Sequence, residues 1–470
     1  MTSPADKLPA RALPLLYLGT AHLSLALACL FAGVWPHAVA GFFYHAWLIG
    51  LVHMVTLGWI TFSILGAIYI VGPHALRMDM PARRLDYVAY ACGLVGLIGL
   101  VGHFWIQQYA GMAWSAATIA AGVLYMTARI ALRVLDSKIQ PAVKLHVVLA
   151  CVNFWIAASM GLLIAFDKIG HFLPGFVIAN VFAHAHLAAL GWATMMVVGV
   201  GYRLLPMMIP SKIPAARSMY ASAFVLEVGV LGLFTTLLQQ TALAAVFGIT
   251  IVAGLITVGT RVAWMRYHRV SKPAGAPLVD FGLLHAVGSA TSLAAASAIG
   301  IVLLLRPSSP AMLRAAAAYG VLGLVGFLAQ MVIAMEARLL PMVTWFWAYA
   351  ASDYRIAPPS PHVTRDRWLQ AIVFIGWTFG VPALAGGMFF ESAMLVRFGA
   401  WALFASVVLA TLDNAFVILT ALNPHTVSMP RAAAARGQLS RGSMGLAREG
   451  IACVGRARRQ PATEPFDALS

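Results

Sequence analysis

A 21-residue segment of this chain occurs three times, and this internal repeat constrains the fold more than any other feature. The first copy, His53–Pro73, is identical to the second, His186–Pro206, at eight of 21 positions, and the two align without a gap. The third copy, Val321–Pro341, also shares eight positions with the second, and it has valine where the other two begin with histidine. Offsets of 133 and 135 residues between the copies indicate three related units in one chain.

The composition places these units in a membrane. The chain is 61% hydrophobic and 10% charged, with a mean hydropathy of +0.86, which is far from the composition of a soluble domain. A membrane-spanning helix needs roughly 20 apolar residues, and helix is expected because lipid cannot satisfy exposed backbone groups. Apolar runs of that kind lie at about 12–35, 45–72, 86–107, 111–135, 144–167, 176–205, 217–239, 241–264, 280–305, 311–340, 367–389 and 394–422.

The predicted fold class is therefore an all-α polytopic membrane protein with about 12 transmembrane helices. The repeat falls on the second, sixth and tenth of these helices, which predicts three related four-helix units within residues 1–422. Pro36, Pro73, Pro206 and Pro341 are expected to end their helices. Residues 423–470 are rich in Ala, Arg, Gly and Ser without a sustained apolar face, and we expect a basic, disordered cytoplasmic tail.

The distribution of charge predicts the orientation in the membrane. With a cytoplasmic N-terminus, the N-terminal segment and the even-numbered loops carry 20 Lys and Arg, the tail carries seven, and the odd-numbered loops carry four. This positive-inside pattern indicates an even number of helices and places both termini in the cytoplasm of a bacterial-type inner membrane. Lipid therefore explains the net charge of +16 better than a nucleic-acid partner, and none is expected.

The two histidines that begin the first two copies are the strongest site candidates. His53 lies about eight residues into its helix and His186 about ten, so they are expected at similar depth in the outer half of the membrane. Two neutral imidazoles facing each other suit low-spin heme iron, and Gly58 and Gly191 would let a flat macrocycle or a neighbouring helix approach. The alternative is a pair of core histidines bonded to carbonyls. His184, two residues before His186, points to the opposite side of its helix and suits a second heme, a metal or an interhelical contact.

The segment His184–Trp192, HAHLAALGW, resembles the catalytic subunit of the heme-copper oxidases, especially the C-type branch. In that family an HxHxxxLGW-like helix supplies one histidine to a high-spin heme and the other to a low-spin heme, whose second ligand comes from the second helix. The resemblance implies that His53 and His186 hold the iron of a low-spin heme b, and that His184 is the axial ligand of a second heme. The segments HMVTLG and HLAALG are more loosely similar to NnrS, a heme- and copper-containing membrane family linked to nitric oxide stress.

The resemblance implies a membrane b-type cytochrome in respiratory electron transfer or in a nitric oxide or oxygen response, with cytochrome c or other respiratory subunits as partners. The chain has no adjacent His-His pair, which the oxidase copper site requires, so copper and oxidase-type oxygen reduction are not expected. Two alternatives remain: an assembly or interaction subunit of a respiratory complex, and a transporter of a small solute or metal. Other buried polar residues suggest either a proton path or interhelical hydrogen bonds: Asn153, Glu227, Gln330, Glu336, Asp413 and Asn414. His22 and His103 fall in the outer half of the membrane and could approach the heme site, whereas His146 and His285 lie near inner helix ends and are weaker candidates.

Overall fold

Every transmembrane helix expected from the hydropathy pattern is present. The computed structural model describes residues 11–270, 279–351, 353–355, 358, 361 and 365–422, and in these residues twelve helices are long and apolar enough to cross a membrane. They run over Ala12–Val34, Ala46–His74, Arg84–Trp105, Tyr109–Asp136, Pro141–Gly170, Val177–Met208, Ala216–Leu238, Ala244–Tyr267, Phe281–Leu305, Pro310–Ala351, Arg367–Phe389 and Ala393–Ala421. The protein is an all-α polytopic membrane protein.

The helices form three units with the same internal order. Unit 1 consists of α1 (Ala12–Val34), the short α2 (Pro36–Val39), a second long helix, α5 (Arg84–Trp105) and α6 (Tyr109–Asp136). Unit 2 begins with α7 (Pro141–Gly170) and ends with α10 (Ala216–Leu238) and α11 (Ala244–Tyr267). Unit 3 begins with α12 (Phe281–Leu305) and ends with α15 (Arg367–Phe389) and α16 (Ala393–Leu422).

The second long helix of each unit carries the repeat and widens into a π-helix at the same repeat position. In unit 1 it runs as α3 (Ala46–His53), η2 (Met54–Thr61) and α4 (Phe62–His74). In unit 2 it runs as α8 (Val177–His186), η3 (Leu187–Thr194) and α9 (Met195–Met208). In unit 3 it runs as α13 (Pro310–Val321), η4 (Leu322–Ala329) and α14 (Gln330–Ala351). Each π-helix has eight residues and starts directly after the first residue of its repeat copy. Because π-helices are rare and mostly single turns, three in register are strong structural evidence for three related units.

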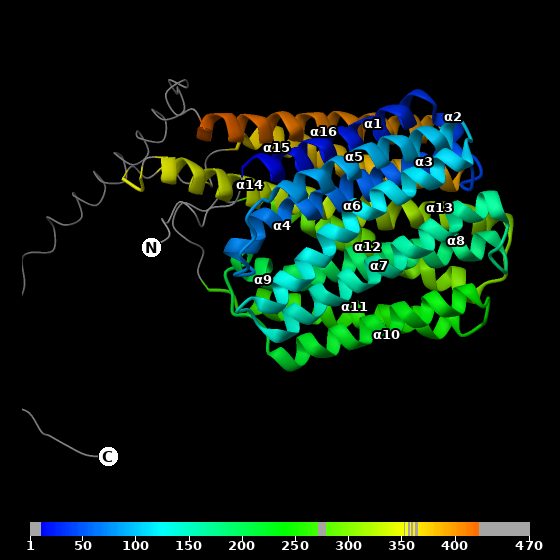
Figure 1. Cartoon of the computed structure of the whole chain (residues 1–470), viewed down its shortest axis with the longest axis horizontal. Coiled ribbons are helices and arrows are strands. Elements are labelled where there is room, and N and C mark those ends of the chain that lie inside the picture. The colour runs from blue at the N-terminus through cyan, green and yellow to red at the C-terminus, as the bar shows by residue number, and fades with distance from the viewer. Residues whose placement is uncertain are drawn as a thin grey trace, which may run out of the picture. The chain divides into compact units, whose positions relative to one another are not determined.

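The three units close into a ring. The fourth helix of unit 1 packs on the first helix of unit 2 (α6 on α7), and α11 packs on α12 in the same way. The ring is completed by α16 and α1, where Trp401 lies against Gly33 and Thr411 contacts His22. Figure 1 shows α1 and α16 side by side at one edge of the bundle, with α10 and α11 at the opposite edge. Inside the ring the three π-helices contact one another.

A glycine near the middle of each π-helix lets the first helix of the same unit approach closely. A Cβ added to Gly58 would lie 2.0 Å from Ser24 Oγ on α1, and one added to Gly191 would lie 2.8 Å from Asn153 Cβ on α7. The equivalent Gly326 faces Ser292 on α12 at 2.7 Å. Of the two uses considered for Gly58 and Gly191, the structure therefore supports the approach of a neighbouring helix.

The expectation that prolines end four of the helices is confirmed at Pro36, since α1 ends at Val34, and was wrong for the other three. Pro73 and Pro206 lie inside the last turns of α4 and α9, and α14 continues for ten residues beyond Pro341. A proline removes only its own donor, and a membrane helix tolerates this where packed neighbours satisfy the freed carbonyl. The predicted tail, residues 423–470, lies outside the described residues.

Substitution of Gly58 by alanine should destabilise the protein, because the new Cβ would overlap Ser24 and approach Leu97. Overpacking of this kind costs about 1–3 kcal/mol. The measurement is thermal unfolding of the purified protein followed by its loss from the monodisperse gel-filtration peak. Gly323→Ala is the matched control, since that glycine lies in η4 with nothing within 4 Å of the added atom. Equal melting of the two variants would contradict the packing role.

Candidate functional site

The histidines of the repeat lie where the second helices of neighbouring units meet, at the start of the π-helices. For description we call the first residue of each copy the anchor position (His53, His186 and Val321). The residue two places earlier is the flanking position (Leu51, His184 and Tyr319). The anchor of one unit meets the flanking residue of the next, which gives three related interfaces with different side chains.

The interface between units 1 and 2 joins two histidines. His53, the last residue of α3, is half-buried and stacks on Phe104 of α5, with ring centroids 5.3 Å apart. His184 of α8 lies against α7, where a Cβ on Gly161 would come within 2.7 Å of its ring. The two imidazoles are close enough to interact electrostatically. Two nitrogen ligands from facing helices are thus available at this interface.

The interface between units 2 and 3 joins a histidine to a tyrosine. His186 Nε2 lies 3.0 Å from the hydroxyl of Tyr319 on α13, and the two rings are stacked with centroids 5.7 Å apart. Both side chains are half-buried. This contact ties α8 to α13 at the depth of the anchor positions.

The interface between units 3 and 1 carries only apolar side chains at the corresponding positions. Val321 and Leu51 both line a cavity of about 190 Å³, together with Leu25, Cys29 and Val55. Neither Val321 nor Leu51 is ionisable, so at the anchor and flanking positions the three interfaces share a backbone arrangement but not a chemistry.

One turn deeper, tryptophans join the π-helices to one another. The indole N–H of Trp192 in η3 donates to Thr61 Oγ1 in η2 at 3.2 Å, and that of Trp59 in η2 donates to the carbonyl of Ala329 in η4 at 3.2 Å. The third copy has Phe327 at this position, which has no donor, so the third bond of the ring is missing. Two of the three contacts between units are therefore fixed by a buried hydrogen bond.

All three repeat histidines are oriented by a backbone carbonyl. The Nδ1 atoms lie 2.8 Å from Ile49 O for His53, 2.8 Å from Phe182 O for His186 and 2.9 Å from Ala157 O for His184. A carbonyl accepts only, so Nδ1 carries the proton in each ring and Nε2 carries the lone pair. This second-sphere arrangement is typical of histidines that bind metal through Nε2. For His53 and His184, Nε2 has no hydrogen-bond partner among the described residues.

The two histidines of the implied heme pair have different neighbours in the structure, and their pairing stays a prediction. His53 shares its interface with His184, whereas His186 faces Tyr319. The predicted opposition of His184 and His186 on their helix agrees with this, since each serves a different interface. The contact of Phe104 with His53 was missed, because no local pattern links a loop-adjacent residue of α5 to the repeat. Tyr319 was also missed, although its position two residues before an anchor is the position of His184.

The other candidate histidines lie away from these interfaces. His22 contacts Glu336, and His103 lies between α5 and α6 with Nδ1 2.6 Å from Gly99 O. His146 bonds Ser222 and His285 bonds Gln330, both buried contacts between helices. The remaining polar candidates also form interhelical bonds, as where Asn153 Nδ2 donates to Glu227 Oε2 at 2.8 Å.

Comparison with protein-family models gives no match for this chain, and no curated protein matches it significantly.

Replacing Tyr319 with phenylalanine should lower the unfolding free energy by about 1 kcal/mol, because His186 Nε2 would lose its hydrogen bond at a half-buried position. Thermal unfolding of the purified variant measures the effect. Tyr109→Phe serves as a control, since that exposed tyrosine makes no hydroxyl hydrogen bond to any residue in the described part of the chain. A Tyr319→Phe variant as stable as wild type would show that the contact contributes nothing.

Proposed function

We propose that this protein is a membrane b-type cytochrome, similar to subunit I of the heme-copper oxidases, which binds heme b between the second helices of units 1 and 2. The observation that carries the proposal is the pair formed by His53 and His184. Each imidazole is held through Nδ1 by a carbonyl, and each leaves Nε2 without a described partner at the same interface.

The donor set of this interface fits heme iron. Neutral imidazole nitrogen is a common axial ligand, and two such ligands give a six-coordinate centre. Both rings lie within membrane spans yet are only half-buried, so neither is sealed by close packing. Polar residues are costly at such depth and usually serve a function. When bound, the heme would supply one-electron redox chemistry, which the protein would tune through these ligands and the surrounding apolar side chains.

The second heme ligand, opposite His53, is either His184 or His186. His184 interacts electrostatically with His53, which supports the pair His53 and His184. The pairing with His186 implied by the oxidase resemblance would require His186 to give up its bond to Tyr319. A second heme would then have to use whichever histidine the first leaves free. Copper is not part of this proposal.

The proposed cellular role is respiratory electron transfer or a nitric oxide or oxygen response, in a bacterial-type inner membrane with both termini cytoplasmic. Cytochrome c or other respiratory subunits are the proposed redox partners.

His53→Ala should abolish the low-spin b-type spectrum, because both proposed pairings require His53. The measurement is the dithionite-reduced minus oxidised optical spectrum, with heme content from a pyridine hemochrome assay. His184→Ala and His186→Ala then identify the opposite ligand: the true partner loses the low-spin bands, and the other retains them.

His103→Ala is the control for these variants, since it removes a half-buried histidine of α5 that bonds Gly99 and Ser115 instead of facing the repeat. Its spectrum should match wild type. Unchanged heme content and spectrum in His53→Ala would refute the heme site, and a heme-free wild-type protein from a heme-replete host would refute the cytochrome proposal.

The proposed orientation can be tested separately with reporter fusions. Alkaline phosphatase inserted between Leu305 and Pro310, where α12 ends and α13 begins, should be active, because it folds only where disulfides form. Green fluorescent protein fused after residue 470 should fluoresce, as expected for a cytoplasmic end. The opposite result at either position would overturn the proposed topology.

A further inference from the structure

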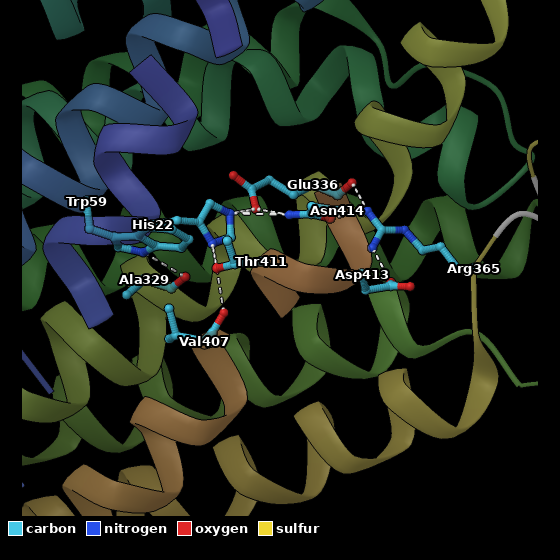
Figure 2. A network of polar contacts seen from close by, with 9 residues as sticks. All are labelled: His22, Trp59, Ala329, Glu336, Arg365, Val407, Thr411, Asp413 and Asn414. Atoms are coloured by element: carbon cyan, nitrogen blue, oxygen red, sulfur yellow. Dashed lines mark hydrogen bonds and ion pairs between the residues drawn. The ribbon is translucent and has the colours of Figure 1, made fainter. Parts of the chain in front are cut away.

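A buried imidazole–carboxylate pair joins the first and tenth transmembrane helices. His22 of α1 and Glu336 of α14 are 5% and 6% exposed, and Nε2 lies 2.9 Å from Oε2 (Figure 2). Asn414 of α16 donates from Nδ2 to the same carboxylate oxygen at 3.2 Å. The indole of Trp59 covers the imidazole edge to face, with centroids 5.0 Å apart. The pair is thus enclosed by three elements and lies beside the π-helix η2.

The hydrogen bonds around the pair place a proton between His22 Nε2 and Glu336 Oε2. Thr411 Oγ1 lies 2.7 Å from both Val407 O and His22 Nδ1, so with its one proton donated to Val407 O it accepts from Nδ1. With Nδ1 protonated, Nε2 has a lone pair in the neutral ring and Oε2 has lone pairs in the carboxylate. Two acceptors at 2.9 Å need a hydrogen between them. The proton is therefore on Nε2 or on Oε2.

The charges of this cluster independently call for one bound proton. Arg365 donates to Asp413 at 2.6 Å and to Asn414 Oδ1 at 2.7 Å, so the guanidinium neutralises Asp413 (Figure 2). Glu336 then remains as one uncompensated negative charge among the described side chains of this cluster. An isolated charge at such a depth is very costly, and one bound proton removes it.

A small cavity lies beside the pair, and a larger cavity shares part of its lining. Glu336 lines a cavity of about 30 Å³, room for about two water molecules, and its Oε1 has no hydrogen-bond partner in the described structure. Ala337, Arg365 and Gln370 line both this cavity and a larger one of about 230 Å³. The larger cavity lies where α9 and α12 have ends, beside Met208 and Asp280.

Other titratable groups face these cavities. His285 of α12 lines the small cavity and is bonded to Gln330, while Asp280 pairs with Arg338 at the larger one. Arg367 of α15 also lines the larger cavity. These groups are either engaged in pairs of their own or positive, and none of them replaces the proton that Glu336 requires.

We propose that His22 and Glu336 form a protonation site that binds one exchangeable proton inside the membrane span, filled through the two cavities from the side on which α12 begins. Loading breaks an O–H bond of a cavity water or hydronium and forms an O–H bond on Glu336. Transfer to the imidazole breaks that bond and forms N–H on His22 Nε2, and no electron is moved. The proposal stands on this cluster alone and does not depend on heme.

Infrared difference spectra of the reconstituted full-length protein across a pH titration test the shared proton, with isotope-labelled histidine to identify the imidazole bands. In wild type, carboxyl and imidazole bands should change together in one transition. Glu336→Gln and His22→Asn should each remove both sets of bands, whereas Glu391→Gln, at an exposed carboxylate, should remove neither. Gel filtration establishes that each variant is folded.

Separate transitions for the two groups in wild type would overturn the proposal even if a variant failed to fold. So would persistence of the coupled transition in Glu336→Gln. The route is tested by hydrogen–deuterium exchange of the same bands in Ala337→Val, which narrows the connection between the cavities. Exchange should slow several-fold relative to Ala185→Val, an exposed alanine of α8. Equal exchange rates would refute entry by these cavities.

Discussion

The close approach of three π-helices at the centre of the ring is the constraint on which the rest of the structure depends. A π-helix has a wider backbone than an α-helix. Three of them can therefore meet only if the helices packed around them approach closely. Glycines at equivalent positions shorten the contact with the first helix of each unit, and tryptophan N–H groups bond the neighbouring π-helix. The positions of the anchor and flanking residues follow from this arrangement, because they immediately precede the π-helices.

Three interfaces built on one backbone arrangement have diverged in chemistry. The first has two imidazoles, the second an imidazole and a phenol, and the third two aliphatic side chains around a cavity. Function on a repeated framework is set by substitutions at such equivalent positions, and the framework itself assigns none. The His22–Glu336 pair joins unit 3 to unit 1. Glu336 lies in the third repeat copy, where the first two copies have Ile68 and Gly201, so the carboxylate is a specialisation of unit 3.

The hydropathy pattern predicted all twelve helices, with ends within a few residues except at the C-terminal end of the tenth, because membrane thickness and backbone satisfaction leave little freedom. It could not predict the π-helices, since no local propensity marks them, nor the continuation of α14 past Pro341, which depends on packed neighbours. The repeat identified His53, His184 and His186, but equivalence along the chain does not say which residues face each other. That depends on the direction in which the ring closes. The role of Arg365 was not predicted for a similar reason, since this residue precedes α15 and contacts α16 only in the folded chain.

The register between anchor and flanking positions has a consequence for changes in chain length. The anchor and flanking residues are only two positions apart, yet they belong to different interfaces. The helix must therefore keep a fixed rotation from its start at Ala46 to the end of η2. An inserted residue would turn everything beyond it by about 100° and exchange the faces presented to both neighbours. This segment should therefore accept many substitutions yet hardly any insertion or deletion, in keeping with repeat copies that align without a gap.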